Sequence, residues 1–216
     1  MERIEVVSVN LATPTQLVCG SGVQTTGLFK KPTLERIEVG SYGLLGDTIM
    51  DTSVHGGLDQ AVYLYWLEDY EWWQRQLGKH LFPGTFGENI VLRGAADIDV
   101  RIGDRIEIGG LELQVTAPRV PCAKLVARMH DETFAKKFVI AARPGFYARV
   151  VEPGSVASGD EAIYVPTDQD YATIKEVFVE WHRSDKSPET LKRALESPIA
   201  KFHRAQLQVW FDAIKA

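Results

Sequence analysis

The sequence contains few cysteines, no surplus of basic residues and no long hydrophobic run. Its two cysteines, Cys19 and Cys122, can form at most one disulfide and lack the CxxC spacing of a zinc site. A formal charge of -5 does not supply the positive surface that a phosphate backbone requires. No stretch reaches the ~18 apolar residues of a membrane helix, and the acidic N-terminus is unlike a signal peptide. We therefore expect a cytoplasmic protein that binds neither nucleic acid nor a membrane.

The composition is that of a globular protein, and most of the chain has the pattern of β-strands. Of the 216 residues, 45% are hydrophobic and 25% are charged, as in ordinary soluble domains. Short alternating runs, such as residues 33–39 and 60–65, are separated by Gly, Pro, Asn and Asp. Between residues 105 and 115, Gly109-Gly110 joins two such runs and predicts a tight hairpin, because glycine adopts positive φ without steric cost. The sequence predicts a mainly β fold.

Helical spacing interrupts the β pattern at two places before residue 166. Residues 67–77 carry apolar side chains at helical intervals, and Gly78 follows as a stop signal. A second helical stretch covers residues 122–141, where Asp131 is a predicted N-cap. We expect these helices to pack against the strands.

After Pro166 the pattern becomes helical and stays so to the C-terminus. We predict a helix over residues 168–182 and two more that begin at Ser187-Pro188 and Ser197-Pro198, with each serine as the N-cap. The chain is therefore divided into residues 1–166 and a three-helix domain of residues 167–216. Acidic and basic residues are equally numerous in this second part, so it lacks the charge of a DNA-binding helix-turn-helix.

The stretch Pro118-Arg-Val-Pro-Cys-Ala-Lys carries the strongest chemical signal. Pro121 ends a strand, so Cys122 falls near the N-terminus of the next helix. The helix dipole and the flanking Arg119 and Lys124 favour the thiolate over the thiol there. Cys122 is therefore a candidate nucleophile or soft metal ligand, although a small buried cysteine that only packs is the common alternative. Cys19, in an apolar strand without a nearby cation, is predicted to be inert.

Loops with glycines or paired cations supply further candidates. His55 precedes Gly56-Gly57, which is typical of a loop that approaches a ligand closely, although histidines in turns are more often structural. The run Gly84-Thr-Phe-Gly-Glu-Asn has glycines that free backbone N–H groups to bind an anion; the alternative is an ordinary turn with Glu88 solvated.

Two cationic stretches are the remaining candidates for binding an anion. Lys30 and Lys31 follow a glycine loop, and Arg143 and Arg149 border another loop and strand. Local positive charge in an acidic protein concentrates anions, and arginines can clamp a phosphate. Solvated lysines and arginines paired with nearby glutamates are the simpler alternatives.

These motifs, in this order, resemble the MOSC family, the molybdenum cofactor sulfurase C-terminal domain fold, and in particular its YiiM-type members. The resemblance rests on His55-Gly-Gly-Leu-Asp-Gln-Ala-Val, Gly84-Thr-Phe-Gly-Glu-Asn, Pro118-Arg-Val-Pro-Cys-Ala-Lys and Arg143-Pro-Gly-Phe-Tyr-Ala-Arg-Val. It covers essentially the whole chain, because such members have a short three-helix region after the β-barrel. It implies a MOSC-type β-barrel over residues 1–166.

The resemblance also implies a cofactor and a set of residues that bind it. Cys122 matches the family cysteine that supplies a thiolate to molybdenum in a molybdopterin-type molybdenum cofactor. Cys122, His55 and Asn89 are the implied catalytic residues, with Cys122 as the metal ligand. The implied cofactor-binding residues are Lys30 (or its neighbour Lys31), His55, Thr85, Phe86, Gly87, Asn89, Arg119, Cys122, Lys124 and Arg149.

The activity implied is reduction of small N-hydroxylated substrates such as 6-N-hydroxylaminopurine to the amine. The sequence has neither a dinucleotide-binding glycine fingerprint nor a cysteine cluster, so the electrons are expected from an external flavoprotein. Two other functions stay open: a sulfur carrier or cofactor-delivery module with a persulfide on Cys122, and an adaptor whose tail recruits a partner. The sequence leaves the oligomeric state open: Trp72 and Trp73 offer more aromatic surface than one helix face buries, which favours a homodimer, but a single packed core could also absorb it.

Overall fold

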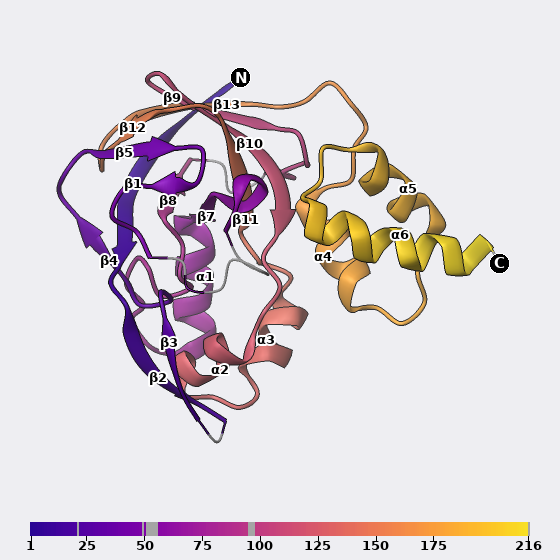
Figure 1. Ribbon diagram of the computed structural model, residues 1–216, viewed down its shortest axis with the longest axis horizontal. Coiled ribbons are helices and arrows are strands. Elements are labelled where there is room, and N and C mark those ends of the chain that lie inside the picture. Colours follow the sequence, from indigo (N-terminus) through magenta and orange to yellow (C-terminus); the bar gives the residue numbers. More distant parts are fainter. Residues whose placement is uncertain (21, 49, 51–55, 95–97, 216) are drawn as a thin grey trace.

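The strands of the N-terminal part form a closed barrel (Figure 1). The computed structural model describes residues 1–20, 22–48, 50, 56–94 and 98–215. The main sheet has the order β13-β9-β10-β11-β7-β8-β1-β4, and a further pairing of β13 with β1 closes a seven-strand barrel. The strands of this sheet are β1 (Glu2–Ala12), β4 (Lys30–Thr33), β7 (Val62–Trp66), β8 (Ile90–Arg93), β9 (Arg105–Ile108), β10 (Leu111–Pro118), β11 (Phe146–Glu152) and β13 (Glu161–Val165). The predicted mainly β fold with a β-barrel is confirmed.

Two small sheets extend the barrel. One is the hairpin of β2 (Thr15–Cys19) and β3 (Gly22–Thr26), and the other joins β5 (Ile37–Gly40), β6 (Gly43–Leu44) and β12 (Gly154–Val156). The single strand predicted over residues 33–39 is wrong, because β4 ends at Thr33 and β5 begins at Ile37. The two strands belong to different sheets, so the chain changes direction between them.

Alternating apolar residues fill the barrel, as the strand period requires. Ile106 and Ile108 are buried on one strand of the predicted hairpin, and Leu111 and Leu113 are buried on the other. Leu111 pairs directly with Ile108 across the Gly109-Gly110 link, where Gly109 has φ 59°. This predicted hairpin is confirmed.

A second, aromatic core lies between one face of the barrel and the helices α1 (Leu67–Leu77), α2 (Ala123–Met129) and α3 (Phe134–Ala141). Trp73 is buried at its centre, stacks on Phe138 with ring centroids 5.9 Å apart and donates a 2.9 Å hydrogen bond to the hydroxyl of Tyr65. Trp72 is covered by the guanidinium of Arg143, 4.9 Å from its ring centroid. The helix therefore buries its own aromatic surface, which removes the reason given above for a homodimer; the dimer itself stays a prediction.

The helical stretch predicted over residues 122–141 is two helices. His130, in the left-handed conformation at φ 52°, ends α2. Asp131 accepts a 2.9 Å hydrogen bond from the backbone N–H of Thr133, and Thr133 is the N-cap of α3. Asp131 thus stabilises the turn before α3 and is not its N-cap as predicted.

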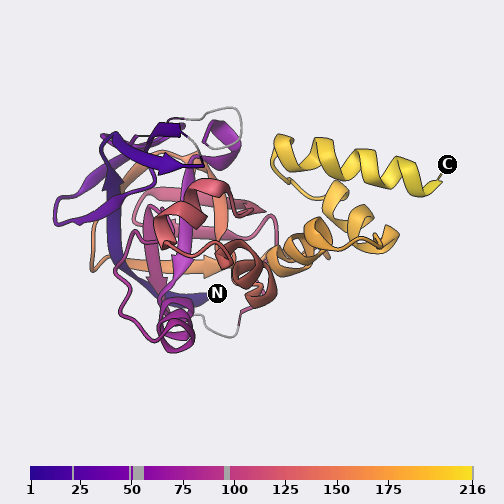
Figure 2. The same cartoon turned by 90° about the horizontal axis from the view of Figure 1, so that it is seen from below.

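The C-terminal region contains α4 (Ile174–His182), α5 (Pro188–Glu196) and α6 (Lys201–Lys215). Figure 2 shows this region on one side of the barrel. Its helices are as predicted in number, and Ser187 caps α5 with Pro188 at its start. Among the helices that the structure describes, none combines the length and apolar character needed to cross a bilayer.

Two predicted helix starts are wrong because other groups cap these helices. α4 begins after Thr173, which forms a capping box with Glu176, and not at residue 168. Ser197 bonds back to the Ala194 carbonyl at the end of α5 and does not open α6. The first N–H of α6, at Lys201, instead donates to the Asp59 carboxylate over 3.0 Å.

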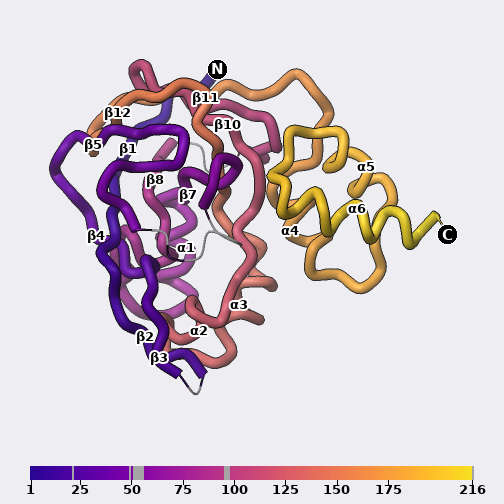
Figure 3. Tube along the Cα trace, in the orientation of Figure 1, coloured from indigo at the N-terminus to yellow at the C-terminus, as the bar shows by residue number. Residues whose placement is uncertain are grey.

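The C-terminal region shares its core with the barrel. Ala172, Val177, Leu191 and Leu207 belong to the same apolar cluster as the barrel interior. Figure 3 traces the chain from the barrel strands across to α4, and the Ala200 N–H donates a 3.1 Å hydrogen bond to the Thr116 carbonyl on β10. The boundary between residues 166 and 167 falls just after β13 ends, but the two parts pack as neighbours.

His203 on α6 should make stability depend on pH. The side chain is buried, and burial lowers the pKa of the imidazole to about 4, well below its ordinary value. The unfolded chain therefore takes up the proton first, so stability is lost as the pH falls from about 6.5 to about 4, by up to about 3 kcal/mol. Unfolding in urea at a series of pH values should show this slope, and His203→Asn should remove it. The same change at exposed His80 is the control; an unchanged slope in His203→Asn would contradict the assignment.

Candidate functional site

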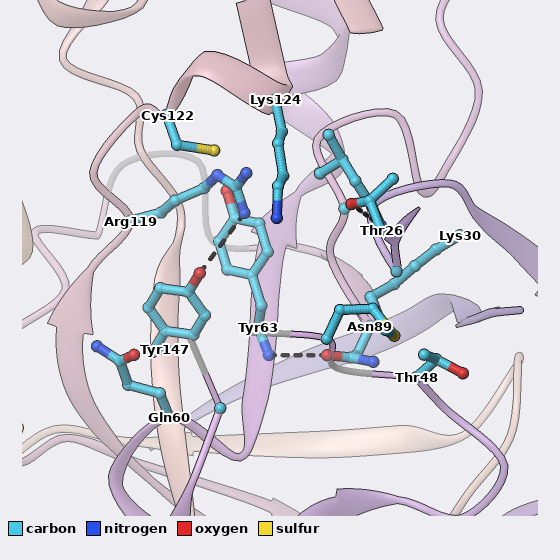
Figure 4. A pocket seen from close by; sticks show the side chains of 15 residues that line it. Thr26, Lys30, Thr48, Gln60, Tyr63, Asn89, Arg119, Cys122, Lys124 and Tyr147 are labelled. Carbon is cyan, nitrogen blue, oxygen red and sulfur yellow. Dashed lines mark hydrogen bonds between the residues drawn. The ribbon is translucent and has the colours of Figure 1, made fainter. Parts of the chain in front are cut away.

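A pocket opens beside the start of α2, at the end of the barrel, and residues from several strands and loops line it. Figure 4 shows Cys122, Arg119 and Lys124 grouped on one side of the pocket and Lys30, Asn89 and Thr48 on another, with the Tyr63 ring between them. The described lining residues are Thr26, Gly27, Leu28, Lys30, Thr48, Met50, Gly56, Gln60, Tyr63, Gly87, Asn89, Arg119, Cys122, Lys124 and Tyr147.

Cys122 is the N-cap of α2, as the sequence predicts. Its backbone is extended, with φ -124° and ψ 165°, and its side chain does not cap the helix. The sulfur faces the pocket on the side of the Arg119 guanidinium (Figure 4). Neither cysteine forms a disulfide with a residue that the structure describes. The thiol at position 122 is half-buried and lines the pocket beside positive charge.

Arg119 is a buried cation without a carboxylate partner in the part of the chain that the structure describes. Only 4% of the residue is exposed, and its Nε has no hydrogen-bond partner. Its Nη1 donates a long 3.5 Å hydrogen bond to the Tyr147 hydroxyl, and its guanidinium carbon lies 5.1 Å from the Tyr63 ring centroid. Burial acts to lower the pKa of Arg119, but attraction to the tyrosine oxygens and the Cys122 sulfur raises it above its ordinary value. The guanidinium stays charged, and a buried unpaired charge is costly unless an anion joins it.

The described pocket wall has three cations and no acidic residue. Lys124 is in the first turn of α2, two residues after Cys122. Its side chain points into the pocket and forms no salt bridge with any described residue. Lys30 is buried and lines the pocket, whereas Lys31 is exposed, so the structure favours Lys30 of the two candidates. In a protein of charge -5, such a local group of cations can concentrate an anion.

Lys30 contributes less free charge than its neighbours because it is paired with Asp47. Burial lowers the pKa of Lys30, and the Asp47 carboxylate opposes that shift. Asp47 also accepts hydrogen bonds of 2.8 Å from the Asn89 amide and from the Ala12 N–H. The oxygen of the Asn89 side chain accepts the Tyr63 N–H at 3.2 Å. Asn89 thus lines the pocket, but its side chain holds strands and loops together.

In the glycine loop of residues 84–88, backbone N–H groups bind the carboxylate of Glu88, a residue of the same loop. The buried Glu88 carboxylate accepts hydrogen bonds from the N–H groups of Gly84 and Phe86 and from the Tyr70 hydroxyl. Neither of the sequence alternatives holds, because Glu88 is not solvated and these N–H groups are not free for a ligand. Gly84, at φ 87°, must be glycine, since a Cβ would lie 2.4 Å from the Lys30 carbonyl oxygen.

Several predicted site residues lie away from the pocket wall. Phe86 is fully buried in the aromatic core, and the Thr85 hydroxyl donates to the Phe82 carbonyl over 2.6 Å. Arg149 pairs with Asp59 at 3.0 Å and donates to the Pro198 carbonyl over 2.8 Å. None of these three is among the described lining residues. His55 lies outside the described residues.

The structure brings together Cys122, Arg119, Lys124, Lys30, Asn89 and Gly87 from the predicted set. Sequence reasoning missed Gln60, Tyr63 and Tyr147, which also line the pocket. Gln60 and Tyr147 stand within two of the quoted motifs, and Tyr63 follows one directly. The strand alternation of β7 and β11 was the available signal, because it decides which of these side chains face the pocket.

This geometry defines a class of protein: a β-barrel whose pocket is lined by cations and has a thiol in its wall. The model of the MOSC domain matches residues 51–163. The chain therefore belongs to the MOSC domain family.

Within that family, the chain is similar to YiiM proteins and their relatives. It is 34% identical over 158 residues to the uncharacterized protein YflK of Bacillus subtilis, covering 73% of this chain and 72% of that protein. It is 31% identical over 143 residues to protein YiiM of Escherichia coli, covering 65% of this chain and 64% of YiiM.

Solved YiiM structures share the fold along nearly the whole chain. The crystal structure of YiiM from Geobacillus stearothermophilus superposes with a TM-score of 0.79 at 24% identity, covering 96% of this chain and 99% of that one. YiiM from Escherichia coli gives a TM-score of 0.75 at 23% identity, covering 99% and 94%. The agreement includes the barrel and the helical C-terminal region.

Proposed function

We propose that the protein binds a molybdopterin-type molybdenum cofactor and reduces N-hydroxylated bases, such as 6-N-hydroxylaminopurine, to the amine. The observation that carries this proposal is Arg119, a buried charge without a carboxylate partner among the described residues, beside Cys122 in a pocket without described acids. Membership of the MOSC family supports it. A relative in Gibberella moniliformis, 32% identical over 143 residues, is called a reductase, although this chain covers only 25% of it.

The residues of the pocket fit such a cofactor. Arg119 and Lys124 would bind its phosphate, because guanidinium and ammonium groups donate several hydrogen bonds to phosphate oxygens. The Cys122 thiolate would bind the metal, since thiolates suit soft centres. The Tyr63 ring, held by a 2.7 Å hydrogen bond from its hydroxyl to the Pro144 carbonyl, packs against the Arg119 guanidinium and would help to position it.

When bound, the cofactor would supply the two-electron reduction that converts R–NH–OH, with two protons, to R–NH₂ and water. Within the described residues, no group of three or more His, Cys, Asp or Glu side chains is arranged to hold a metal ion. We propose that an external flavoprotein supplies the electrons, and that the reaction takes place in the cytoplasm.

Replacing Arg119 by methionine tests the proposal. Wild type purified from cells that make the cofactor should contain molybdenum and a fluorescent oxidised pterin in near-equal amounts and should reduce 6-N-hydroxylaminopurine. The molybdenum and pterin contents of Arg119→Met should both be at least about tenfold lower than those of wild type. The reason is that a charge-assisted phosphate contact contributes about 1.5–3 kcal/mol. The stability of the cofactor-free variant should stay equal or rise, because an unpaired buried charge is removed.

The control is Arg93→Met, at an exposed arginine outside the described pocket wall that pairs with the exposed Glu5. Metal and pterin in neither protein would overturn the cofactor proposal. In that case a labile addition of one sulfur atom on Cys122, detected by mass spectrometry, would support the sulfur-carrier function. The sulfur-carrier function is therefore the second candidate. The half-buried position of Cys122 beside Arg119 supports it, because positive charge stabilises a persulfide anion as well as a thiolate.

A further inference from the structure

Gln60 is a buried polar residue of the pocket that the cofactor contacts proposed above do not use. It ends the short helix η1 (Leu58–Gln60), is 4% exposed and lines the pocket next to Tyr147. A buried amide is neutral, directional and able to donate and accept at once. In Figure 4 its amide oxygen lies on the side of Tyr147 and its amide nitrogen points away. It is therefore suited to read the hydrogen-bonding edge of a ligand.

The C-terminal region holds Gln60 in this position. The Gln60 Nε2 lies 3.4 Å from the Nδ1 of His203 on α6, and both side chains are buried. Because burial keeps the His203 ring neutral, Nδ1 can accept one hydrogen of the amide.

The residue next to Gln60 is fixed by the same region. Asp59 accepts the Lys201 N–H that begins α6 and also pairs with Arg149, each at 3.0 Å. Its carbonyl accepts a 2.6 Å hydrogen bond from the Thr116 hydroxyl on β10. Hydrogen bonds and an ion pair from α6 and from the strands β10 and β11 therefore fix η1. The placement of Gln60 depends on how α6 docks.

We propose that Gln60 is a specificity-determining residue for an adenine-type edge of the substrate, and that His203 is a positioning residue that orients it from the C-terminal region. Among the described residues, no hydrogen bond is recorded for the amide oxygen or the second amide hydrogen of Gln60, and we assign both to the ligand. Asn and Gln amides recognise adenine in this way, accepting from the exocyclic N–H and donating to the neighbouring ring nitrogen. The inference rests on the proposed function and names the feature that separates a purine from other N-hydroxylated compounds.

The test compares Gln60→Met, which keeps the length but removes both polar atoms, with two changes at His203. His203→Phe keeps the ring without an acceptor, whereas Asn places an acceptor near the Nδ1 position. Each loaded enzyme is assayed with 6-N-hydroxylaminopurine and with N-phenylhydroxylamine, which has an N–H but no ring nitrogen beside it. Binding of adenine, the amine product, to the loaded enzyme is measured by titration calorimetry, a readout independent of turnover.

We expect Gln60→Met to weaken adenine binding about three- to tenfold, the effect of losing a neutral hydrogen-bonded contact. The KM for the purine should rise by a similar factor, and N-phenylhydroxylamine should be affected less than twofold. His203→Phe should also weaken adenine binding and raise the KM for the purine, whereas His203→Asn should keep most of the wild-type binding. A general loss of structure would instead affect both substrates and would not be rescued by asparagine.

Two results would overturn the inference in distinguishable ways. If wild type reduces the purine while Gln60→Met binds adenine unchanged, Gln60 does not read the substrate and the proposed function stands. If the loaded wild type reduces neither substrate, the proposed function falls and this inference falls with it. If His203→Phe does not fold, Gln60→Met and His203→Asn still decide between these outcomes.

Discussion

Cys122→Ser should abolish turnover and remove bound molybdenum while leaving the protein as stable as wild type, or more so. Cys122 is the N-cap of α2 and its side chain makes no capping hydrogen bond. Serine is one of the best N-cap residues, so the substitution gives α2 a cap that it now lacks, worth about 0.5–1 kcal/mol. A serine hydroxyl does not ionise near neutral pH and is a hard ligand, so it cannot replace a thiolate at a soft metal. We expect turnover to fall by about 10³-fold or more, as when a group essential to the reaction is removed.

Opposite changes in stability and activity make this substitution informative. Metal analysis, pterin fluorescence and thermal unfolding should be recorded on the same preparations. Cys19→Ser is the matched control, because Cys19 lies on the β2-β3 hairpin and does not line the pocket. A Cys122→Ser protein that keeps its metal and its turnover would show that the thiol is only packing, which the sequence left open.

The sequence predicted local features well because their causes are local. Pro121 and the dipeptide Gly109-Gly110 constrain the backbone of their own neighbours, so the start of α2 and the β9-β10 hairpin could be placed from them. The prediction that Pro121 ends the strand is wrong, because β10 already ends at Pro118. The position of Cys122 at a helix N-terminus follows from the same reasoning. Asp131 fails for the opposite reason: its side chain could cap any of several adjacent turns, and only packing decides which.

The assembly of the site depends on contacts between distant segments. Closure of the barrel brings Lys30 and Arg119 to one pocket, and no sequence spacing reports that closure. Tyr147 and Arg149 are two residues apart on β11, which separates them by about 7 Å along the strand. That distance places Tyr147 in the pocket and Arg149 against Asp59 and the C-terminal region.

Glu88 shows a similar limit in the glycine loop. From the sequence, a carboxylate after Gly84-Thr-Phe-Gly could be solvated while the loop binds a foreign anion. In the structure, Phe86 inserts into the aromatic core and draws the loop inward, and Glu88 satisfies the N–H groups that are buried with it. Buried backbone donors need partners, so the carboxylate nearest in the chain takes that role.

Asp47→Asn should cause a large loss of stability, about 3–5 kcal/mol, by leaving the Lys30 ammonium buried without a counter-charge. The side chains of Lys30 and Asp47 are 6% and 4% exposed, so water cannot replace the lost partner. Asparagine can still accept the Ala12 N–H, but its NH₂ group replaces the oxygen that accepts hydrogen bonds from Lys30 and Asn89. Chemical denaturation at neutral pH should show the loss. Glu5→Gln is the matched control, because the pair of Glu5 with Arg93 is 46% and 52% exposed and should cost less than about 1 kcal/mol.

The pH dependence of the Asp47→Asn variant distinguishes a stranded charge from simple loss of packing. Burial already lowers the pKa of Lys30, and Asp47 opposes that shift, so removing the carboxylate lowers the pKa further. The folded variant then releases its proton at a lower pH than the unfolded chain, so its stability rises as the pH increases toward the unfolded lysine value of about 10.4. The deficit relative to wild type should therefore shrink in alkaline solution. Lys30→Met combined with Asp47→Leu should recover much of the stability, because no buried charge is left unpaired. A deficit that is independent of pH and persists in the double variant would show that the loop contacts of Asp47, and not its charge, stabilise this side of the pocket.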